Sequence, residues 1–163
     1  MTKNYFIDLA NYNIWANDIV CSWLEQINAE QWEQPIVSSF NSIQGTVLHL
    51  ISAEHIWVQR LDKLEKTEWL ASTYKGTKEQ HIALWKQSSA NLKKLLEDFD
   101  EDKLRVKFEF KRINGEVNIL EYYQSFAHIF NHSTYHRGQV LTMLRQVGFT
   151  NVGSTDMLIF YRL

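Results

Sequence analysis

The sequence predicts an all-α protein built on four long helices, with one short β-hairpin before the fourth. Four segments carry apolar residues at helical spacing over twenty or so positions. Six Gly and one Pro in 163 residues leave too few turn signals for a sandwich or barrel of many short strands. Apolar residues make up 45% of the chain, which excludes a disordered protein. This length suits a single domain, expected to span residues 1–163.

The first two helices are predicted at residues 4–28 and 43–64. Asn13 and Asn17 fall inside the apolar stripe of the first helix. Because buried amides need hydrogen-bond partners, we expect them to pair with facing helices or to line a polar interior. Residues 29–42 contain the single Pro and form a connection long enough to cross the end of a bundle.

Capping signals mark the starts of the second and third helices. Asn41 followed by Gln44 resembles a capping box for the second helix. The third helix is predicted at residues 77–99, with the hydroxyl of Thr77 as its N-cap.

The apolar period changes from helical to two between residues 104 and 119. Phe108 and Phe110 alternate there with charged residues, and Asn114-Gly115 is a type I′ turn signal. A short hairpin is therefore predicted. A lone hairpin is marginal in water, so we expect it to lie against the helices as an ornament.

The fourth helix is predicted at residues 120–147, with Gly148 as its C-terminal cap. The apolar tail, residues 156–163, forms either a short strand or one helical turn.

A second apolar line on the first helix widens its apolar arc beyond that of an ordinary surface helix. The line consists of Tyr5, Tyr12, Ile19 and Trp23. Another subunit is one way in which such a line becomes covered.

Charge and cysteine usage narrow the possible partners and the compartment. The formal net charge is −2, so no general attraction to nucleic acid or to anionic lipid is expected. The start of the chain lacks the apolar core of a signal peptide, and no segment is apolar enough to span a bilayer. We expect a cytoplasmic protein. Cys21, the single cysteine, is expected to be an inert core residue.

Three histidines of the predicted fourth helix, His128, His132 and His136, are spaced four residues apart and share a face. Zinc and other first-row ions take neutral imidazoles, and two neighbours of this series can reach one ion. The residues alone leave open which two. A third ligand would come from a facing helix, where His49 is best placed. The competing interpretation is a solvated polar face, or core imidazoles bonded to backbone carbonyls.

The other two histidines are not expected to join this group. His55 lies on a different face of the second helix from His49. His81 is near the start of the third helix, beside charged residues, and is expected to be exposed.

Three segments of the sequence together carry a family resemblance: NHSTYHRGQVLTMLRQVG at residues 131–148, YNIWAN at residues 12–17 and SIQGTVLHLISAEHIW at residues 42–57. They resemble the DinB / YfiT-like superfamily of metalloenzymes, the group that includes the bacterial thiol transferases. These segments occur in the family's order and span most of the chain. The His-x-x-x-His-Arg-Gly-Gln string is the most specific of the matches.

The resemblance implies a four-helix bundle of up-down-down-up topology and a homodimer. It also implies one divalent metal ion held by His49, His132 and His136, and so selects the second histidine pair. Zinc or nickel is expected, with iron and manganese as alternatives. His128 then lies one turn before the ligands and is either a substrate-facing group or a packed structural histidine.

Three residues that follow the predicted ligands are also candidates for a role. Gln139 lies on the ligand face and, like His128, is a candidate catalytic residue; it bonds either a ligand or a facing helix. Arg137 points away from His132 and is expected to form a salt bridge or a dimer contact. Gly138 is expected to mark close packing against another helix.

Three protein ligands leave a coordination position open, which is the arrangement of a catalytic metal site. A thiol bound there would lose its proton more easily. We therefore expect a metal-dependent transferase that conjugates a low-molecular-weight thiol to an electrophilic small molecule. The alternatives are a non-enzymatic, metal-binding dimer serving as a stress-response or interaction module, and a metal-assisted hydrolase.

Overall fold

Four long helices dominate the computed structural model, which describes residues 2–163. They are α1 (Lys3–Gln26), α3 (Ile43–Leu61), α5 (Lys78–Asp98) and α6 (Tyr122–Gln146). The short elements are α2 (Ala29–Glu33), α4 (Leu70–Thr73), η1 (Glu101–Lys103), β1 (Lys107–Lys111), β2 (Val117–Glu121) and α7 (Met157–Phe160). Within residues 2–163, no helix combines the length and apolar character needed to cross a membrane.

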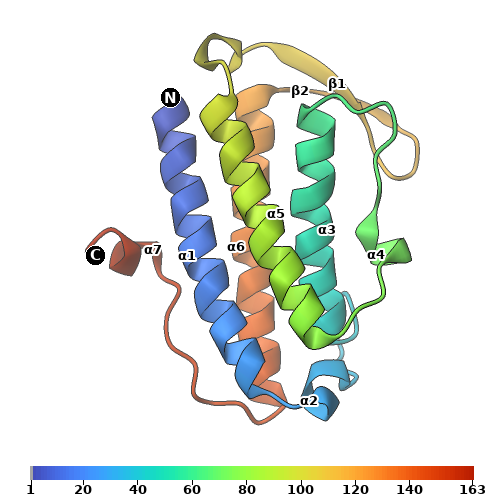
Figure 1. Cartoon of the computed structure of the whole chain (residues 1–163), viewed down its shortest axis with the longest axis vertical. Coiled ribbons are helices and arrows are strands. Elements are labelled where there is room, and N and C mark those ends of the chain that lie inside the picture. Colours follow the sequence, from blue (N-terminus) through green and yellow to red (C-terminus); the bar gives the residue numbers. More distant parts are fainter. Residues whose placement is uncertain (1) are drawn as a thin grey trace.

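The four long helices form an up-down-down-up bundle with a hairpin before the last helix, as predicted (Figure 1). α1 and α3 each pack against α5 and α6, so α1 and α3 lie diagonally across the bundle. Residues 27–42, which include α2, cross one end of the bundle along that diagonal. Residues 62–77 return along its length and connect the parallel helices α3 and α5. We call residues 62–77 the crossover.

The caps agree with the sequence at one helix and differ at another. Thr77 caps α5 in a capping box with Gln80. Asn41 does not cap α3, because the N-cap is Ser42, whose side chain accepts a hydrogen bond from the backbone N–H of Gly45. Asn41 instead takes a left-handed conformation with φ of 61°, which Asn tolerates better than most residues.

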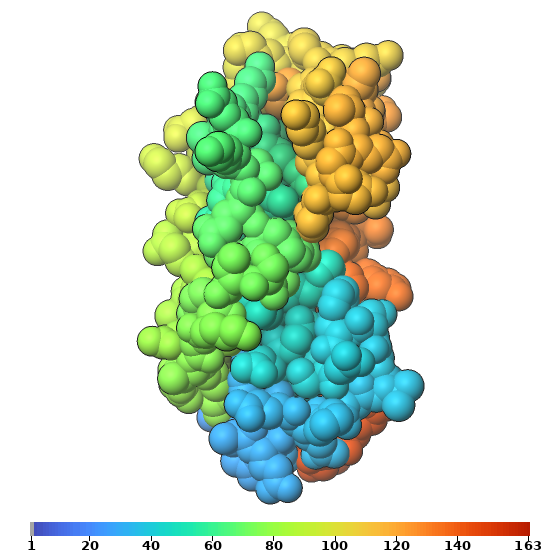
Figure 2. All heavy atoms as spheres, turned by 90° about the vertical axis from the view of Figure 1, so that its right-hand side faces the viewer, coloured from blue at the N-terminus to red at the C-terminus, as the bar shows by residue number. Residues whose placement is uncertain are grey.

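The hairpin pairs β1 with β2 in antiparallel register, with Phe110 opposite Asn118. Its turn is not the predicted type I′ turn, which requires a positive φ at both central residues. Only Gly115 has one there, at 86°, and the backbones of Arg112 and Glu116 close a longer loop. The hairpin and the crossover lie on the same face of the molecule (Figure 2). The hairpin is more than an ornament, because it forms one wall of the cavity described below.

Two groups of buried apolar side chains fill the bundle, one toward α2 and the other toward the hairpin. Trp32 of α2 is buried in the first group, to which Trp85 also belongs, so this short helix, which the sequence pattern did not predict, closes one end of the core. Phe6 and Phe126 lie in the second group with ring centroids 5.3 Å apart. Replacing a buried Phe or Trp of this kind by Ala lowers the free energy of unfolding by about 3 to 5 kcal/mol.

A buried polar layer separates the two apolar groups along every long helix. At its centre is Glu54 of α3, whose side chain is 1% exposed. Its carboxylate accepts hydrogen bonds from Asn13 Nδ2 at 2.8 Å, Asn17 Nδ2 at 3.3 Å and Ser89 Oγ at 2.7 Å. Asn13 and Asn17 point inward as predicted, and they pair with facing helices.

Arg137 of α6 completes this layer from the opposite side. Its guanidinium donates to Oδ1 of both Asn13 and Asn17, and to Thr134 Oγ1 at 2.9 Å. The ring of Tyr12 covers it, with the guanidinium carbon 5.3 Å from the ring centroid. Arg137 is therefore an internal group of the bundle, bonded to amides and a hydroxyl, rather than the salt bridge or dimer contact expected from the sequence. The two amides connect its charge to that of Glu54.

The aromatic line on α1 is largely covered by the chain's own C-terminal segment. The hydroxyl of Tyr12 donates to the carbonyl of Thr155 at 2.8 Å, and Phe160 of α7 packs edge-on against the Tyr12 ring. Trp23 is also buried, whereas Tyr5 remains 48% exposed. The tail thus forms one helical turn, and the line does not need a second subunit to cover it.

The polar layer predicts a large difference between two arginines of α6. Arg137→Met should lower the free energy of unfolding by about 3 kcal/mol, because it leaves the Glu54 charge without its countercharge and strands two amide oxygens. Arg145→Met is the control, because Arg145 is exposed on the same helix and should change stability by about 0.5 kcal/mol. Urea denaturation measures both, and equal losses would contradict a stabilising role for the layer.

Candidate metal centre

The structure brings three histidines from two helices together. One ring nitrogen each from His49 of α3 and from His132 and His136 of α6 lies within 4.8 Å of the others. Nε2 of His49 is 2.9 Å from Nε2 of His132. The four-residue spacing on α6 puts His132 and His136 on one face, and the packing of α3 against α6 supplies the third ring.

Aromatic packing and one side-chain hydrogen bond hold these rings in place. Phe40, from the connection before α3, stacks on His49 with centroids 4.0 Å apart, and Trp69 contacts His49 edge-on at 5.7 Å. Nδ1 of His136 donates to Oε1 of Gln139 at 2.6 Å, which leaves Nε2 of that ring free as an acceptor. Nδ1 of His49 is buried without a hydrogen-bond partner in the described chain.

All three imidazoles are held in the neutral form. Burial lowers the pKa of His49 to about 4, with a further contribution from the neighbouring charge of His136. Burial and the other three histidines of the site region lower the pKa of His132 to about 3. The pKa of His136 is also lowered by burial, against the opposing effect of Gln139. Neutral imidazoles are the form that binds metal ions.

This donor set fits a divalent first-row metal ion. Three neutral imidazole nitrogens converge from two rigid helices, and the Nε2 atoms of His49 and His132 are close enough, at 2.9 Å, to bind one ion. Imidazole donors suit zinc, nickel, iron and copper, and manganese less well. No carboxylate joins the three histidines in the described part of the chain, so three protein ligands would leave coordination positions open.

A cavity of about 600 Å³ opens beside His49 and His132. Its walls come from α3, the crossover, the hairpin and α6. The aromatic lining residues are Trp57, Trp69 and Phe110, and the polar ones outside the histidine cluster are Arg60, Arg112, Asn114, Asn118 and His128. A hollow of this size can hold a small molecule with one end at the histidines.

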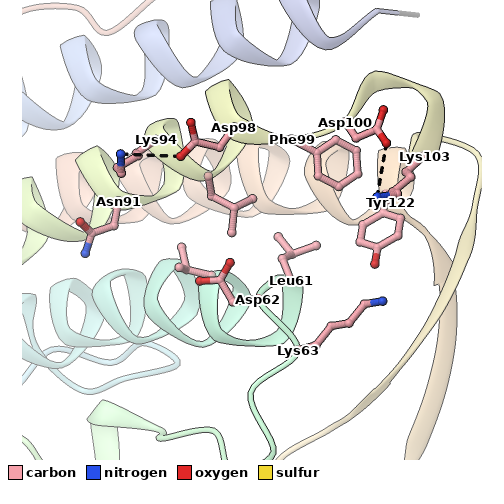
Figure 3. Close-up of a pocket in the computed structure, with 12 residues that line it drawn as sticks. Leu61, Asp62, Lys63, Asn91, Lys94, Asp98, Phe99, Asp100, Lys103 and Tyr122 are labelled. Carbon is pink, nitrogen blue, oxygen red and sulfur yellow. Dashed lines mark ion pairs between the residues drawn. The ribbon is translucent and has the colours of Figure 1, made fainter.

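A second hollow, of about 590 Å³, lies between the ends of α3 and α5 near η1 (Figure 3). Lys94 pairs there with Asp98, and Lys103 pairs with Asp100. The three clustered histidines are not among its lining residues. Its charges already satisfy one another in part, and the cavity beside the histidines is the better candidate for a functional site.

Two further candidates from the sequence lie at or beside this site. His128 lines the cavity, with its ring 5.4 Å from Trp57 and 5.8 Å from His132, so its position favours the substrate-facing alternative. Gln139 does not reach a facing helix, because its amide oxygen bonds His136 on its own helix.

Other residues singled out in the sequence have structural surroundings. Cys21 is fully buried, and burial raises the pKa of its thiol to about 12, which fits an inert core cysteine. His55 contacts Gln59 instead of the cluster, as expected. The prediction of an exposed His81 is wrong, because its ring packs against Trp32 and Tyr74 in the core. The predicted close packing at Gly138 is also wrong, because a Cβ there would meet no atom within 4 Å.

Three residues that shape the site were not predicted from the sequence. Phe40 and Trp69 lie in connections without a periodic pattern, and only the fold brings them to His49. The sequence pattern does not single out Glu54, yet it is the centre of the polar layer. The two inward amides of α1, Asn13 and Asn17, were the feature of the sequence that could have indicated a buried charge facing them.

An up-down-down-up bundle with histidines converging from α3 and α6 defines a class of helical-bundle proteins with a candidate metal centre beside a cavity. Within that class the chain belongs to the DinB family, whose sequence model matches residues 1–162.

Known proteins of this family are similar to the chain in sequence and in fold. It is 27% identical over 155 residues to Protein DinB of Bacillus subtilis (strain 168), a match that covers 91% of this chain and 90% of that protein. A crystal structure of a DinB-like protein from Bacillus cereus ATCC 10987 shares the fold with a TM-score of 0.74, at 16% identity over 94% of this chain and 97% of that one. A crystal structure of a DinB-like protein from Bacillus subtilis shares the fold with a TM-score of 0.67, at 14% identity over 91% of this chain and 96% of that one.

The neutral histidines predict acid sensitivity of the metal-free protein. The unfolded chain protonates these rings near pH 6.5, whereas His132 stays neutral in the fold down to about pH 3. Between those values the unfolded state binds more protons, so stability is lost as pH falls. Between pH 6.5 and 5, the free energy of unfolding of the chelated protein should fall by about 1 kcal/mol less in His132→Gln than in wild type, a figure that allows for partial exposure of the ring. Urea denaturation measures both profiles. Parallel pH profiles would contradict this.

Proposed function

We propose that this protein binds one divalent metal ion through His49, His132 and His136 and conjugates a low-molecular-weight thiol to an electrophilic small molecule. The cavity beside the histidines is the observation that supports this proposal most strongly. A purely structural metal site needs no space for a second molecule, whereas a transferase must admit one. The sequence resemblance to the thiol transferases adds support for the type of reaction.

The choice of ion and its contribution follow from the donors. Three imidazoles favour zinc or nickel, with iron or manganese as alternatives. When bound, such an ion lowers the pKa of a thiol or water that occupies its open position. No protein nucleophile is then required, in agreement with the burial of Cys21.

The chain's own residues orient the ligands and surround the reactants. Gln139 fixes the ring of His136 by holding the proton on its Nδ1. Trp57, Trp69 and Phe110 supply apolar walls that displace water from the reacting molecules. His128 faces the cavity with a neutral ring, because burial and the nearby charge of Arg60 lower its pKa, and that ring can accept a hydrogen bond from a bound reactant.

The overall reaction balances without an oxidant or a reductant. The thiol gives up its proton, its sulfur forms a bond to an electrophilic carbon, and the leaving group departs from that carbon with the bonding electrons. Metal-assisted hydrolysis would use the same site with water in place of the thiol.

The first prediction of this proposal concerns metal content. Elemental analysis of the purified protein should find about one divalent ion per chain, and the His132→Ala/His136→Ala double variant should lose it. His55→Ala is the control, because His55 lies on α3 outside the cluster and should leave the metal content unchanged. Chelation should lower the melting temperature of wild type but not of the double variant. Undiminished metal in the double variant would overturn the assignment.

The second prediction concerns activity. Metal-loaded protein should conjugate at least one of a panel of small thiols to 1-chloro-2,4-dinitrobenzene, with release of chloride. The double variant should fall to the uncatalysed rate, while His55→Ala should keep wild-type turnover. No turnover with any thiol or metal would exclude the transferase. Hydrolysis of an activated ester under the same conditions would then point to water as the nucleophile.

A further inference from the structure

The hairpin side of the cavity contains polar groups that the fold leaves unsatisfied. Arg60 of α3 and Asn118 of β2 both line the cavity. Nε of Arg60 and Nδ2 of Asn118 are buried and have no hydrogen-bond partner in the described chain. Both atoms are donors, and an unsatisfied buried donor costs about 1 to 3 kcal/mol. A small rotation of either side chain toward the cavity, which both line, would let a ligand with acceptor oxygens remove this cost.

The same region has an excess of positive charge. Arg60 and Arg112 line the cavity, and no Asp or Glu is among its described lining residues. Arg112 pairs with Glu116 on the exposed loop of the hairpin at 3.2 Å, whereas no such ion pair involves Arg60 in the described chain. Burial and the charge of Arg112 both lower the pKa of Arg60. An anionic group is the complement of this surface.

The guanidinium of Arg60 is also held in a fixed position. Its carbon lies 5.0 Å from the ring centroid of Trp57 and 5.1 Å from that of Phe110. Nη2 donates to the backbone carbonyl of Lys111 at 3.0 Å, which ties the group to β1. A pre-positioned guanidinium retains its planar set of donors and matches a carboxylate better than a flexible ammonium does.

We propose that this cavity binds a small molecule with an apolar or aromatic body and a carboxylate, the carboxylate meeting Arg60 and Asn118 and the body lying against Trp57. His49 and His132 line the same cavity, so such a ligand extends from the arginine toward the histidine cluster. This inference rests on the proposed function only in one respect: if the protein is a transferase, the carboxylate-bearing molecule is its substrate. The binding itself is measurable without any turnover.

The test compares two ligands of nearly equal shape, 3-phenylpropanoate and its neutral amide, by calorimetry and by protein-detected NMR. The acid should bind the protein about tenfold more tightly than the amide, which corresponds to one charge-assisted interaction. Arg60→Gln, which keeps polar donors but removes the charge, should reduce that preference to near one. Arg162→Gln is the control, because Arg162 is exposed in the tail and should leave the preference unchanged.

A second variant guards against misfolding of the first. Asn118→Leu keeps the charge of Arg60 and should weaken binding of the acid several-fold, with chemical-shift changes still centred on the cavity. Each variant is first checked by its melting temperature. Any of three results would overturn the proposal: equal binding of the acid and the amide, no binding of the acid at about 10 mM, or a preference for the acid that survives Arg60→Gln.

Chelation separates this site from the metal centre. The preference for the acid should persist after metal removal and in His132→Ala, because it depends on Arg60. A preference that disappears with the metal would mean that the carboxylate binds the ion directly, and would overturn the proposal while supporting the metal centre. Conversely, conjugation without any preference for the acid would leave the proposed function intact.

Discussion

The buried polar layer around Glu54 and Arg137 is the constraint on which the geometry of the site depends. It takes one carboxylate from α3, two amides from α1, a hydroxyl from α5 and a guanidinium from α6. Burial raises the pKa of Glu54, against the hydrogen bonds from Ser89 and the two amides, and it lowers the pKa of Arg137, against the effects of Tyr12 and of the Glu54 charge. Unlike apolar contacts, these hydrogen bonds are directional, so they fix the rotation and the height of each helix.

That constraint reaches the histidines through adjacent positions on α6. Arg137 follows His136 directly, and Ser133, whose hydroxyl lies 3.5 Å from Glu54, follows His132. Neighbouring residues on a helix point about 100° apart, so while Arg137 and Ser133 face the interior, the two histidines point to the cluster with His49. A helix rotation that moved the histidines would also break the buried network. The rings are thus positioned by bonds made on the other side of the same helix.

Most of the helical architecture was predictable from the sequence, because an apolar face repeats at a period that a helix alone satisfies. Each long helix begins and ends within three residues of its predicted position. The histidine cluster was predictable in part, since the spacing of His132 and His136 is local, while the choice of that pair needed the family motif. Contacts between distant segments were not predictable. Phe40 and Trp69 reach His49 only through the path of two connections, and the partners that identify Glu54 as a buried charge come from other helices.

The hairpin and the crossover form a cavity on the outer side of α3 and α6 that is available to ligands. A four-helix bundle packed by side chains alone would leave the outer faces of α3 and α6 open to solvent. Here the hairpin contributes Phe110 and Asn118, and the crossover contributes Trp69, so both cover that face without filling it. Because neither element supplies any part of the polar layer, sequence changes in them can alter the cavity while the helices keep the histidines in register. The polar layer that orients the helices is therefore separate from the hairpin and crossover residues that shape the cavity, although Trp69 of the crossover also contacts His49.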